Sequence, residues 1–262
     1  MLALPALAAP YAFGVVPQRS AVLTAQYWNP ILNYISTATG IQIELKMART
    51  APEHAEGIGR GEYDLLYSNH QFKPENDTQG YRVFARPIDA SISGQIVVPA
   101  DSQLQKIEDL AGKEVVFPSQ VAFVGFTVPM DGLKRAGIEV KALFAGNQEG
   151  AMGQLRAGRA VAAGVNSQVM ADYAKREAYG YRVLWASESY LNIPLAAHPR
   201  VPAAHVEALR KAFVAMSEDP AGQLVLRTSA ALVKQSPPYG FVVASDSEYD
   251  NQRRVYRGAV SR

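Results

Sequence analysis

Residues 41–70 read IQIELKMARTAPEHAEGIGRGEYDLLYSNH and carry a strand, a helix and a second strand in succession. Apolar residues occupy every second position from Ile41 to Met47, the period of a half-buried strand. Thr50 and Glu53 have the spacing of a capping box, and the helix they open is expected to end by Gly59 or Gly61. Residues 63–67 (YDLLY) predict the next strand. Such a unit is typical of a parallel sheet in an α/β protein.

The same alternation continues on both sides of this unit. Residues 13–17 predict a strand, and apolar residues from Trp28 to Ile35 recur at helical spacing until Gly40. Asn29 and Pro30 are the expected N-cap and first position of that helix. Downstream strands are expected at residues 95–99, 113–117, 140–144, 160–165 and 181–185, and helices near 130–136, 151–157 and 203–216. The charged stretch 248–257 is expected to be a solvated helix face.

The chain has no Gly/Ser-rich linker that would separate two consecutive domains. Its 262 residues are nevertheless enough for two domains of ordinary size. Two domains would therefore have to be interleaved, with the chain crossing over near residues 90–95 and returning near 186–194.

Composition excludes several classes of protein. The net charge is +2 and no Lys/Arg tract is present, so neither a nucleic acid nor an anionic membrane surface is an expected partner. No internal stretch reaches the ~18 to 20 apolar residues of a membrane-spanning helix. The chain has no cysteine, and none of its histidines has a companion at metal-ligand spacing, so we expect no disulfide, metal or other cofactor.

Catalytic motifs are also missing from the sequence. It contains no G-x-S-x-G elbow, H-E-x-x-H, P-loop or G-x-G-x-x-G after the first strand, which predicts that the protein is not an enzyme. Residues 1–10 (MLALPALAAP) are apolar and end in small residues, as the tail of a secretory signal peptide does. We therefore expect a periplasmic location.

Five short passages, taken in order, resemble one known family. They are GRGEYD (59–64), DSQLQKIEDLAGK (101–113), GFTVP (125–129), AGNQE (145–149) and GRA (158–160). Together they resemble the PhnD-like periplasmic phosphate-, phosphite- and phosphonate-binding proteins of ABC importers, in the type II periplasmic binding protein superfamily. The resemblance runs over nearly the whole chain.

The resemblance implies two α/β lobes joined by two crossover strands, with a ligand cleft between them. Lobe 1 would comprise residues 11–92 and 190–262, and lobe 2 residues 93–189. The implied function is capture of a small phosphate- or phosphonate-like oxyanion for the permease of an ABC importer. The alternative is a periplasmic sensor protein that presents its ligand to a membrane histidine kinase.

Three aligned positions differ from the family pattern. Where phosphonate-binding relatives carry Ser-Thr-Ser-Gly at the start of a lobe 2 helix, this chain has Ala122, Phe123, Val124 and Gly125. Backbone N–H groups and the helix dipole would remain there to hold an anion, but the three hydroxyls are lost. Asn147 and Gln148 stand where relatives carry a histidine near a Gly-Gly or Ala-Gly turn, and Asn147 is the predicted site residue. Asn166 replaces an acidic residue, which disfavours a ligand with an ammonium group.

Polar residues at the carboxyl ends of strands complete the predicted site, because open α/β sheets bind ligands there. Gln18 and Arg19 follow the first strand, and Thr50 follows the second. Ser68, Asn69 and His70 follow the third. Arg19 could pair with an oxyanion or be a solvent-exposed residue beside a turn. Ser68, Asn69 and His70 could instead serve only as a helix-capping turn, and Phe123 could be a cleft wall or ordinary core packing.

Overall fold

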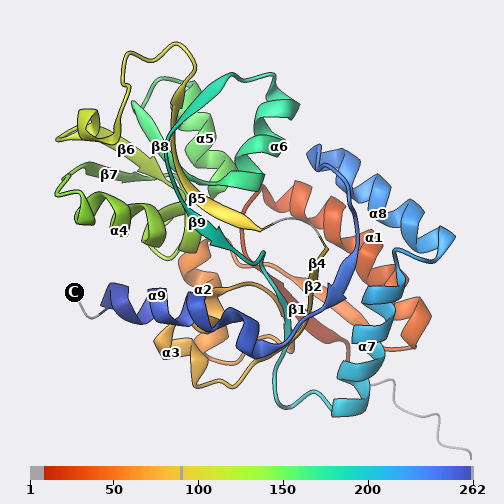
Figure 1. Cartoon of the computed structure of the whole chain (residues 1–262). Helices are drawn as coiled ribbons and strands as arrows, with labels where there is room; N and C mark the ends of the chain where they lie inside the picture. The colour runs from red at the N-terminus through yellow and green to blue at the C-terminus, as the bar shows by residue number, and fades with distance from the viewer. Residues whose placement is uncertain (1–8, 89–90, 261–262) are drawn as a thin grey trace, which may run out of the picture.

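The computed structural model describes residues 9–88 and 91–260, which form two β-sheets (Figure 1). The strands of the first sheet are β1 (Tyr11–Val15), β2 (Ile43–Lys46), β3 (Leu65–Tyr67), β4 (Arg82–Pro87), β10 (Leu195–Ala197) and β11 (Phe241–Val243). Those of the second are β5 (Ile92–Pro99), β6 (Glu114–Phe117), β7 (Lys141–Phe144), β8 (Ala162–Asn166) and β9 (Tyr181–Tyr190). The orders are β11-β4-β10-β3-β1-β2 and β7-β6-β8-β5-β9.

Each sheet mixes parallel and antiparallel pairs. In the first sheet β1 runs parallel to β2 and β3, whereas β10 and β11 are antiparallel to their neighbours. In the second sheet β6 runs parallel to β7 and β8, and β5 is antiparallel to β8 and β9. The parallel pairs confirm the βαβ units predicted from the sequence.

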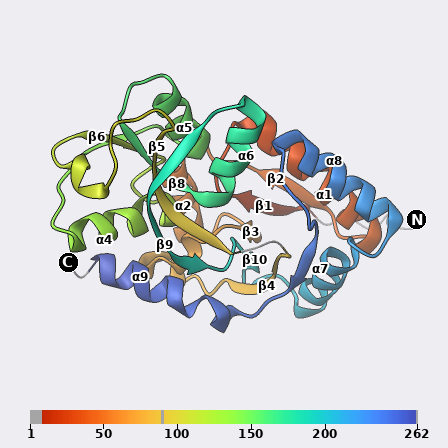
Figure 2. The ribbon, with the colours of Figure 1, turned by 45° about the horizontal axis from the view of Figure 1, so that its top comes forward.

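Helices cover both sheets (Figure 2). Those of the first lobe are α1 (Ala21–Thr39), α2 (Ala51–Gly59), α3 (Pro74–Asp77), α7 (Ala203–Ala215), α8 (Pro220–Val233) and α9 (Asp250–Val260). Those of the second are α4 (Val128–Arg135), α5 (Gln148–Arg156) and α6 (Ser167–Glu177). Short helical turns are η1 (His70–Phe72), η2 (Ile107–Leu110), η3 (Phe123–Thr127) and η4 (Asp246–Tyr249).

The chain changes sheets between β4 and β5 and returns between β9 and β10, so the two halves are interleaved as predicted. The predicted lobe limits, residues 11–92 with 190–262 and residues 93–189, remain a proposal. Residues 1–8 of the predicted signal-peptide tail lie outside the described residues. Within residues 9–88 and 91–260, no helix combines the length and the apolar character needed to cross a membrane.

The predicted start of the first helix is wrong. Helix α1 begins at Ala21, with the Ser20 hydroxyl accepting a hydrogen bond from the Leu23 amide (3.3 Å), and Pro30 lies inside the helix. Pro30 cannot donate to the Gln26 carbonyl, a defect that typically costs about 3 kcal/mol. The helix continues because one face, with Trp28 and Ile35 among its residues, is buried on the first sheet.

The prediction of a solvated face at residues 248–257 is correct for only one side of this segment. Tyr249 and Gln252 are fully buried, and the side chain of Arg253 is only 9 % exposed. Helix α9 is amphipathic, and its apolar face packs on α3 and on η3 of the other lobe. Arg253 on this helix is therefore a buried cation, and nearby carboxylates must neutralise its charge.

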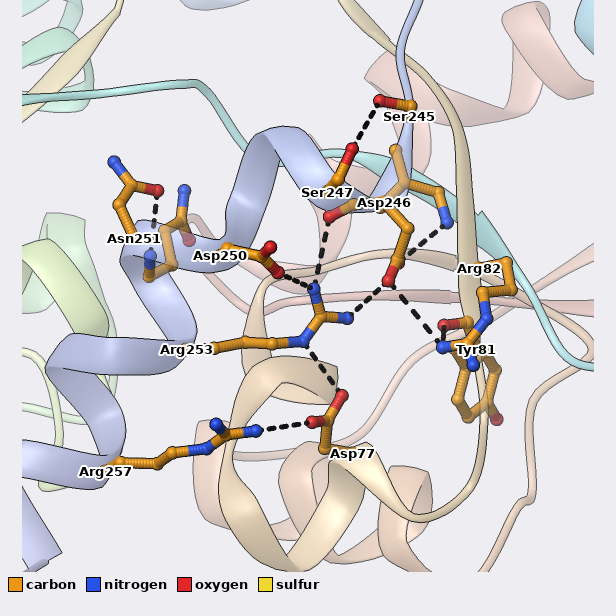
Figure 3. A network of polar contacts seen from close by, with 12 residues as sticks. Asp77, Tyr81, Arg82, Ser245, Asp246, Ser247, Asp250, Asn251, Arg253 and Arg257 are labelled. Carbon is orange, nitrogen blue, oxygen red and sulfur yellow. Dashed lines mark hydrogen bonds and ion pairs between the residues drawn. The ribbon is translucent and has the colours of Figure 1, made fainter.

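Arg253 is compensated by carboxylates from three short segments (Figure 3). Its guanidinium contacts Asp77 on α3 (3.0 Å), Asp246 on η4 (2.7 Å) and Asp250 on α9 itself (3.1 Å). It also lies 4.6 Å from the centroid of the Phe72 ring, a cation–π distance. This network fixes α9 to the first lobe.

We expect Arg253→Ala to destabilise the protein by about 3 kcal/mol, because it leaves Asp77 and Asp246 partly buried without their main cation. The matched control is Arg257→Ala, which removes a 63 % exposed side chain that contacts Asp77 at 3.5 Å and should cost less than about 1 kcal/mol. Urea unfolding measures both values. Equal losses in the two variants would contradict the role given to Arg253.

Candidate functional site

A small cavity lies where the two sheets face each other, and we call it the central cavity. Its volume is about 30 Å³, which is room for two or three water-sized groups. Its polar and aromatic walls are formed by Gln18, Asn69 and His70 from the first lobe and by Ser119, Phe123, Gln148 and Asn166 from the second. Pro17, Ala51, Pro118, Ala122 and Val124 are further wall residues. Residues far apart in the sequence thus meet at one point.

The structure brings together part of the predicted site. Predicted residues that line the central cavity are Gln18, Asn69, His70, Phe123, Val124 and Asn166. Predicted residues that do not line it are Arg19, Thr50, Ser68, Gly125 and Asn147. The second group lies directly beside the wall, and each member has a structural role of its own.

Thr50 and Asn147 cap helices. The Thr50 hydroxyl accepts from the Glu53 amide (3.2 Å) at the start of α2, and the Glu53 carboxylate accepts from the Arg49 amide. The Asn147 side chain accepts from the Gly150 amide (2.8 Å) at the start of α5. Both side chains are therefore engaged by the backbone of their own segment.

Ser68 and Gly125 support the wall from behind. The Ser68 hydroxyl accepts from the His70 amide (3.1 Å) and lies 3.1 Å from Nε2 of His54. At Gly125 a Cβ atom would lie 2.5 Å from Nε2 of Gln148. A Cβ atom would also lie 2.8 Å from Cγ of Pro118, so a larger residue here would displace two residues of the wall.

Arg19 reaches across the cleft to the second lobe. Its guanidinium lies 3.3 Å from the Asp172 carboxylate on α6 and 3.9 Å from that of Glu149 on α5. Glu149 also pairs with Arg176 at 2.8 Å. In this conformation Arg19 therefore connects the lobes and does not line the central cavity.

The lining of the central cavity carries no formal charge. Burial, together with the nearby His54 and Lys73, lowers the pKa of His70 well below its usual value, so its imidazole is neutral at physiological pH. The cavity residues otherwise have amide, hydroxyl or hydrocarbon side chains. Any positive potential from the lining must therefore come from the dipoles of the backbone and of the neutral polar side chains.

Helices of the second lobe start at the cavity and supply that potential. Phe123 opens η3, which continues into α4, and Gln148 opens α5. Asn166 precedes α6, and its side chain accepts from the Gln168 and Val169 amides at 2.9 and 3.3 Å. Helix N-termini attract anions because their first N–H groups have no intrahelical acceptor.

Two residues of the cavity wall each carry a buried polar atom without a hydrogen-bond partner among the described residues. These atoms are Nδ1 of His70 and the hydroxyl oxygen of Ser119. Burying such groups unpaired costs about 1 to 3 kcal/mol each. A ligand with hydrogen-bonding oxygens would recover this cost.

Sequence reasoning missed Ser119 and Gln148 as site residues. Ser119 follows β6 at its carboxyl end, so the strand-end rule that selected Asn69 would also have selected it. Gln148 lies beside Asn147, but only Gln148 lines the cavity, and its Oε1 accepts from the Asn166 amide (3.0 Å). The sequence gives no sign of which neighbour faces inward.

Phe123 is both a cavity wall and part of the core. It is 2 % exposed, and its ring centroid lies 5.0 Å from that of Tyr190 and 4.9 Å from that of Tyr256 on α9. Phe123, Val124 and Val128 thereby join a hydrophobic cluster whose other members come mainly from the first lobe. Core packing of Phe123 is thus observed, and its role as the wall of a ligand cleft remains a proposal.

The chain was compared with protein families and known structures. Residues 13–249 match the family model described as "ABC transporter, phosphonate, periplasmic substrate-binding protein". PhnD1 from Prochlorococcus marinus, solved with methylphosphonate, is 16 % identical with a TM-score of 0.80, over 96 % of this chain and 98 % of that one. A binding protein component of an ABC phosphonate transporter from Pseudomonas aeruginosa is 17 % identical with a TM-score of 0.82, over 96 % and 87 %.

A third similar structure comes from Xanthomonas citri and has ATP bound. It is 15 % identical, with a TM-score of 0.73 over 97 % of this chain and 98 % of that one. A search of curated proteins found no significant match. The structural matches agree with the predicted two-lobed α/β fold, and none supports the predicted alternative of a sensor protein for a histidine kinase.

His54, which lies behind the cavity wall beside Ser68, predicts that the protein becomes less stable at acid pH. Burial lowers the pKa of His54 to about 3, against about 6.5 when unfolded. Between these values the unfolded state binds more protons, so the free energy of unfolding should fall as the pH falls, by up to about 1.4 kcal/mol per pH unit. His54→Gln should reduce this slope in urea unfolding between pH 7 and 4. Ser68→Ala keeps the His54 imidazole and should not reduce the slope. An unchanged slope in His54→Gln would contradict the lowered pKa of His54.

Proposed function

Because the chain belongs to the family of periplasmic substrate-binding proteins of phosphonate ABC transporters, we propose that it captures a small phosphonate-like oxyanion between its lobes and delivers it to the permease. The central cavity carries this proposal. Helix starts of one lobe and strand ends of the other meet there around two buried groups without partners, His70 Nδ1 and the Ser119 hydroxyl. The periplasm is the compartment in which this family works, and we propose that residues 1–10 are the end of the signal that directs export.

The oxyanion would be held by neutral donors. Hydrogen bonds from N–H and O–H groups to a charged oxygen contribute about 1.5 to 3 kcal/mol each. The Ser119 hydroxyl, the His70 imidazole, the Asn69 amide and the N–H groups at the start of η3 are the proposed donors. With Phe123 and Val124 in place of hydroxyl residues, fewer side-chain donors remain than the family pattern offers.

Closure of the lobes would complete the site. The described conformation is closed, since the Glu149 amide donates to the Gln18 carbonyl across the cleft (3.2 Å) and the Asn192 side chain donates to Oε1 of Gln168 (2.8 Å). Opening would have to break these bonds and the Arg19–Asp172 pair. We propose that the lobes move relative to each other by the hinge motion common to two-lobed binding proteins.

Calorimetric titration with methylphosphonate, phosphite and phosphate tests the proposed site. Ser119→Ala should weaken binding of the best of these ligands about tenfold or more, because it removes one hydrogen bond to a charged oxygen. The control is Ser229→Ala on α8, another buried hydroxyl without a partner among the described residues, which does not line the central cavity. No binding by the wild-type protein would reject the proposed function, and equal effects of the two variants would reject the site.

Small-angle scattering tests the role of Arg19. We expect ligand-free Arg19→Gln to have a larger radius of gyration than the wild-type protein, since the variant loses the ion pairs to Asp172 and Glu149. Arg159→Gln, at an exposed position on the second lobe, is the charge-matched control and should scatter like the wild type. Identical profiles for all three proteins would contradict a role for Arg19 in closure.

A further inference from the structure

A second cavity lies beside the central cavity, and we call it the side cavity. The two share Val16 and Gln18 in their walls. The side cavity has a volume of about 40 Å³, room for about three non-hydrogen atoms. A group attached to an oxyanion in the central cavity would pass Gln18 and enter this space.

The walls of the side cavity combine aromatic rings with amide side chains. Tyr27 and Trp28 on α1 and Tyr67 at the end of β3 form one wall, with the Trp28 and Tyr67 ring centroids 4.7 Å apart. Gln18, Gln168 and Gln235 also line the space, and the Tyr27 hydroxyl donates to Oε1 of Gln235 at 3.0 Å. The rings suit a short hydrocarbon, and the amides suit a group that donates and accepts hydrogen bonds.

The charges around the side cavity oppose a cationic substituent. Arg19 is the charged residue among those described that line it, and no carboxylate does. The nearest acidic partners of Arg19 are Asp172 and Glu149, and Glu149 is also paired with Arg176. Aromatic rings attract cations, but an ammonium here would face Arg19 and have no carboxylate of its own.

We infer that the side cavity receives the substituent of the bound oxyanion, and that this substituent is short, uncharged and hydroxyl-bearing. This inference rests on the proposed function and narrows its substrate class. It selects phosphonates with a two-carbon hydroxylated chain over those with the corresponding amine. The two compounds of such a pair are nearly equal in size, so charge and hydrogen-bonding capacity distinguish them.

The test is calorimetric titration with 2-hydroxyethylphosphonate, 2-aminoethylphosphonate and methylphosphonate. We expect the wild-type protein to bind the hydroxyl compound at least about tenfold more tightly than the amine. Gln168→Glu places a carboxylate in the side cavity and keeps the Oε1 that accepts from Asn192 (2.8 Å). In this variant the preference for the hydroxyl compound should fall at least about tenfold.

The control is Gln154→Glu on α5, which adds the same charge at a position that lines none of the cavities and should keep the wild-type preference. Equal wild-type affinities for the two compounds, or the same ratio in Gln168→Glu and Gln154→Glu, would overturn the inference and leave the oxyanion site intact. Methylphosphonate binding without 2-hydroxyethylphosphonate binding would also overturn it. Failure of the wild-type protein to bind any of the three would reject both the inference and an alkylphosphonate ligand.

Discussion

The packing of Phe123 and Val124 against the first lobe sets the character of the cleft. These residues open the helical segment that starts the second lobe's side of the cavity, and both are almost fully buried in a cluster shared with the first lobe. Their side chains can donate no hydrogen bond, so this part of the wall offers a ligand only backbone N–H groups. The same contact makes closure partly a hydrophobic event, since opening would expose two apolar side chains to water.

An uncharged lining follows from how the ion pairs are arranged. Arg19 is diverted from the cavity by Asp172 and Glu149 on the facing helices, and burial keeps His70 neutral. The lining of the central cavity therefore contains no unpaired charge. An unpaired charge buried there would destabilise the fold by several kcal/mol. Helix N-termini can still attract an anion, because their dipoles are fixed by the backbone and need no counter-ion.

Helix α9 links the end of the chain to the wall of the site. Arg253 holds the helix on the first lobe through Asp77 and Asp246, and Tyr256 lies one turn further on against Phe123 of the second lobe. The helix spans the border between the lobes (Figure 2). Its anchoring thus determines the surface on which Phe123 rests when the cleft is closed.

The sequence by itself determined the order of most strands and helices, because period-two and helical spacing are local properties of neighbouring residues. It did not predict the strands β4, β10 and β11 or the helix α6. Residues 41–70 predicted their strand–helix–strand unit correctly, and the lack of a linker predicted interleaved lobes. The start of α1 was misplaced because Pro30 is a strong local signal. Burial of one face of α1 on the first sheet stabilises the helix by more than Pro30 destabilises it. The free energy of this burial depends on sheet residues that are distant in the chain, so the local sequence does not reveal it.

Only the tertiary structure decided which polar residues face the cavity. Asn147 and Gln148 are equally polar neighbours, yet one caps a helix and the other lines the wall. From the sequence, Arg19 could be either an anion ligand or a solvent-exposed residue, and Arg253 was expected on a solvated helix face. Their observed partners lie 153 and 176 positions away along the chain. The orientation of a side chain and its ion pairs depend on contacts between segments that are distant in the chain, and a single sequence does not show which segments are in contact.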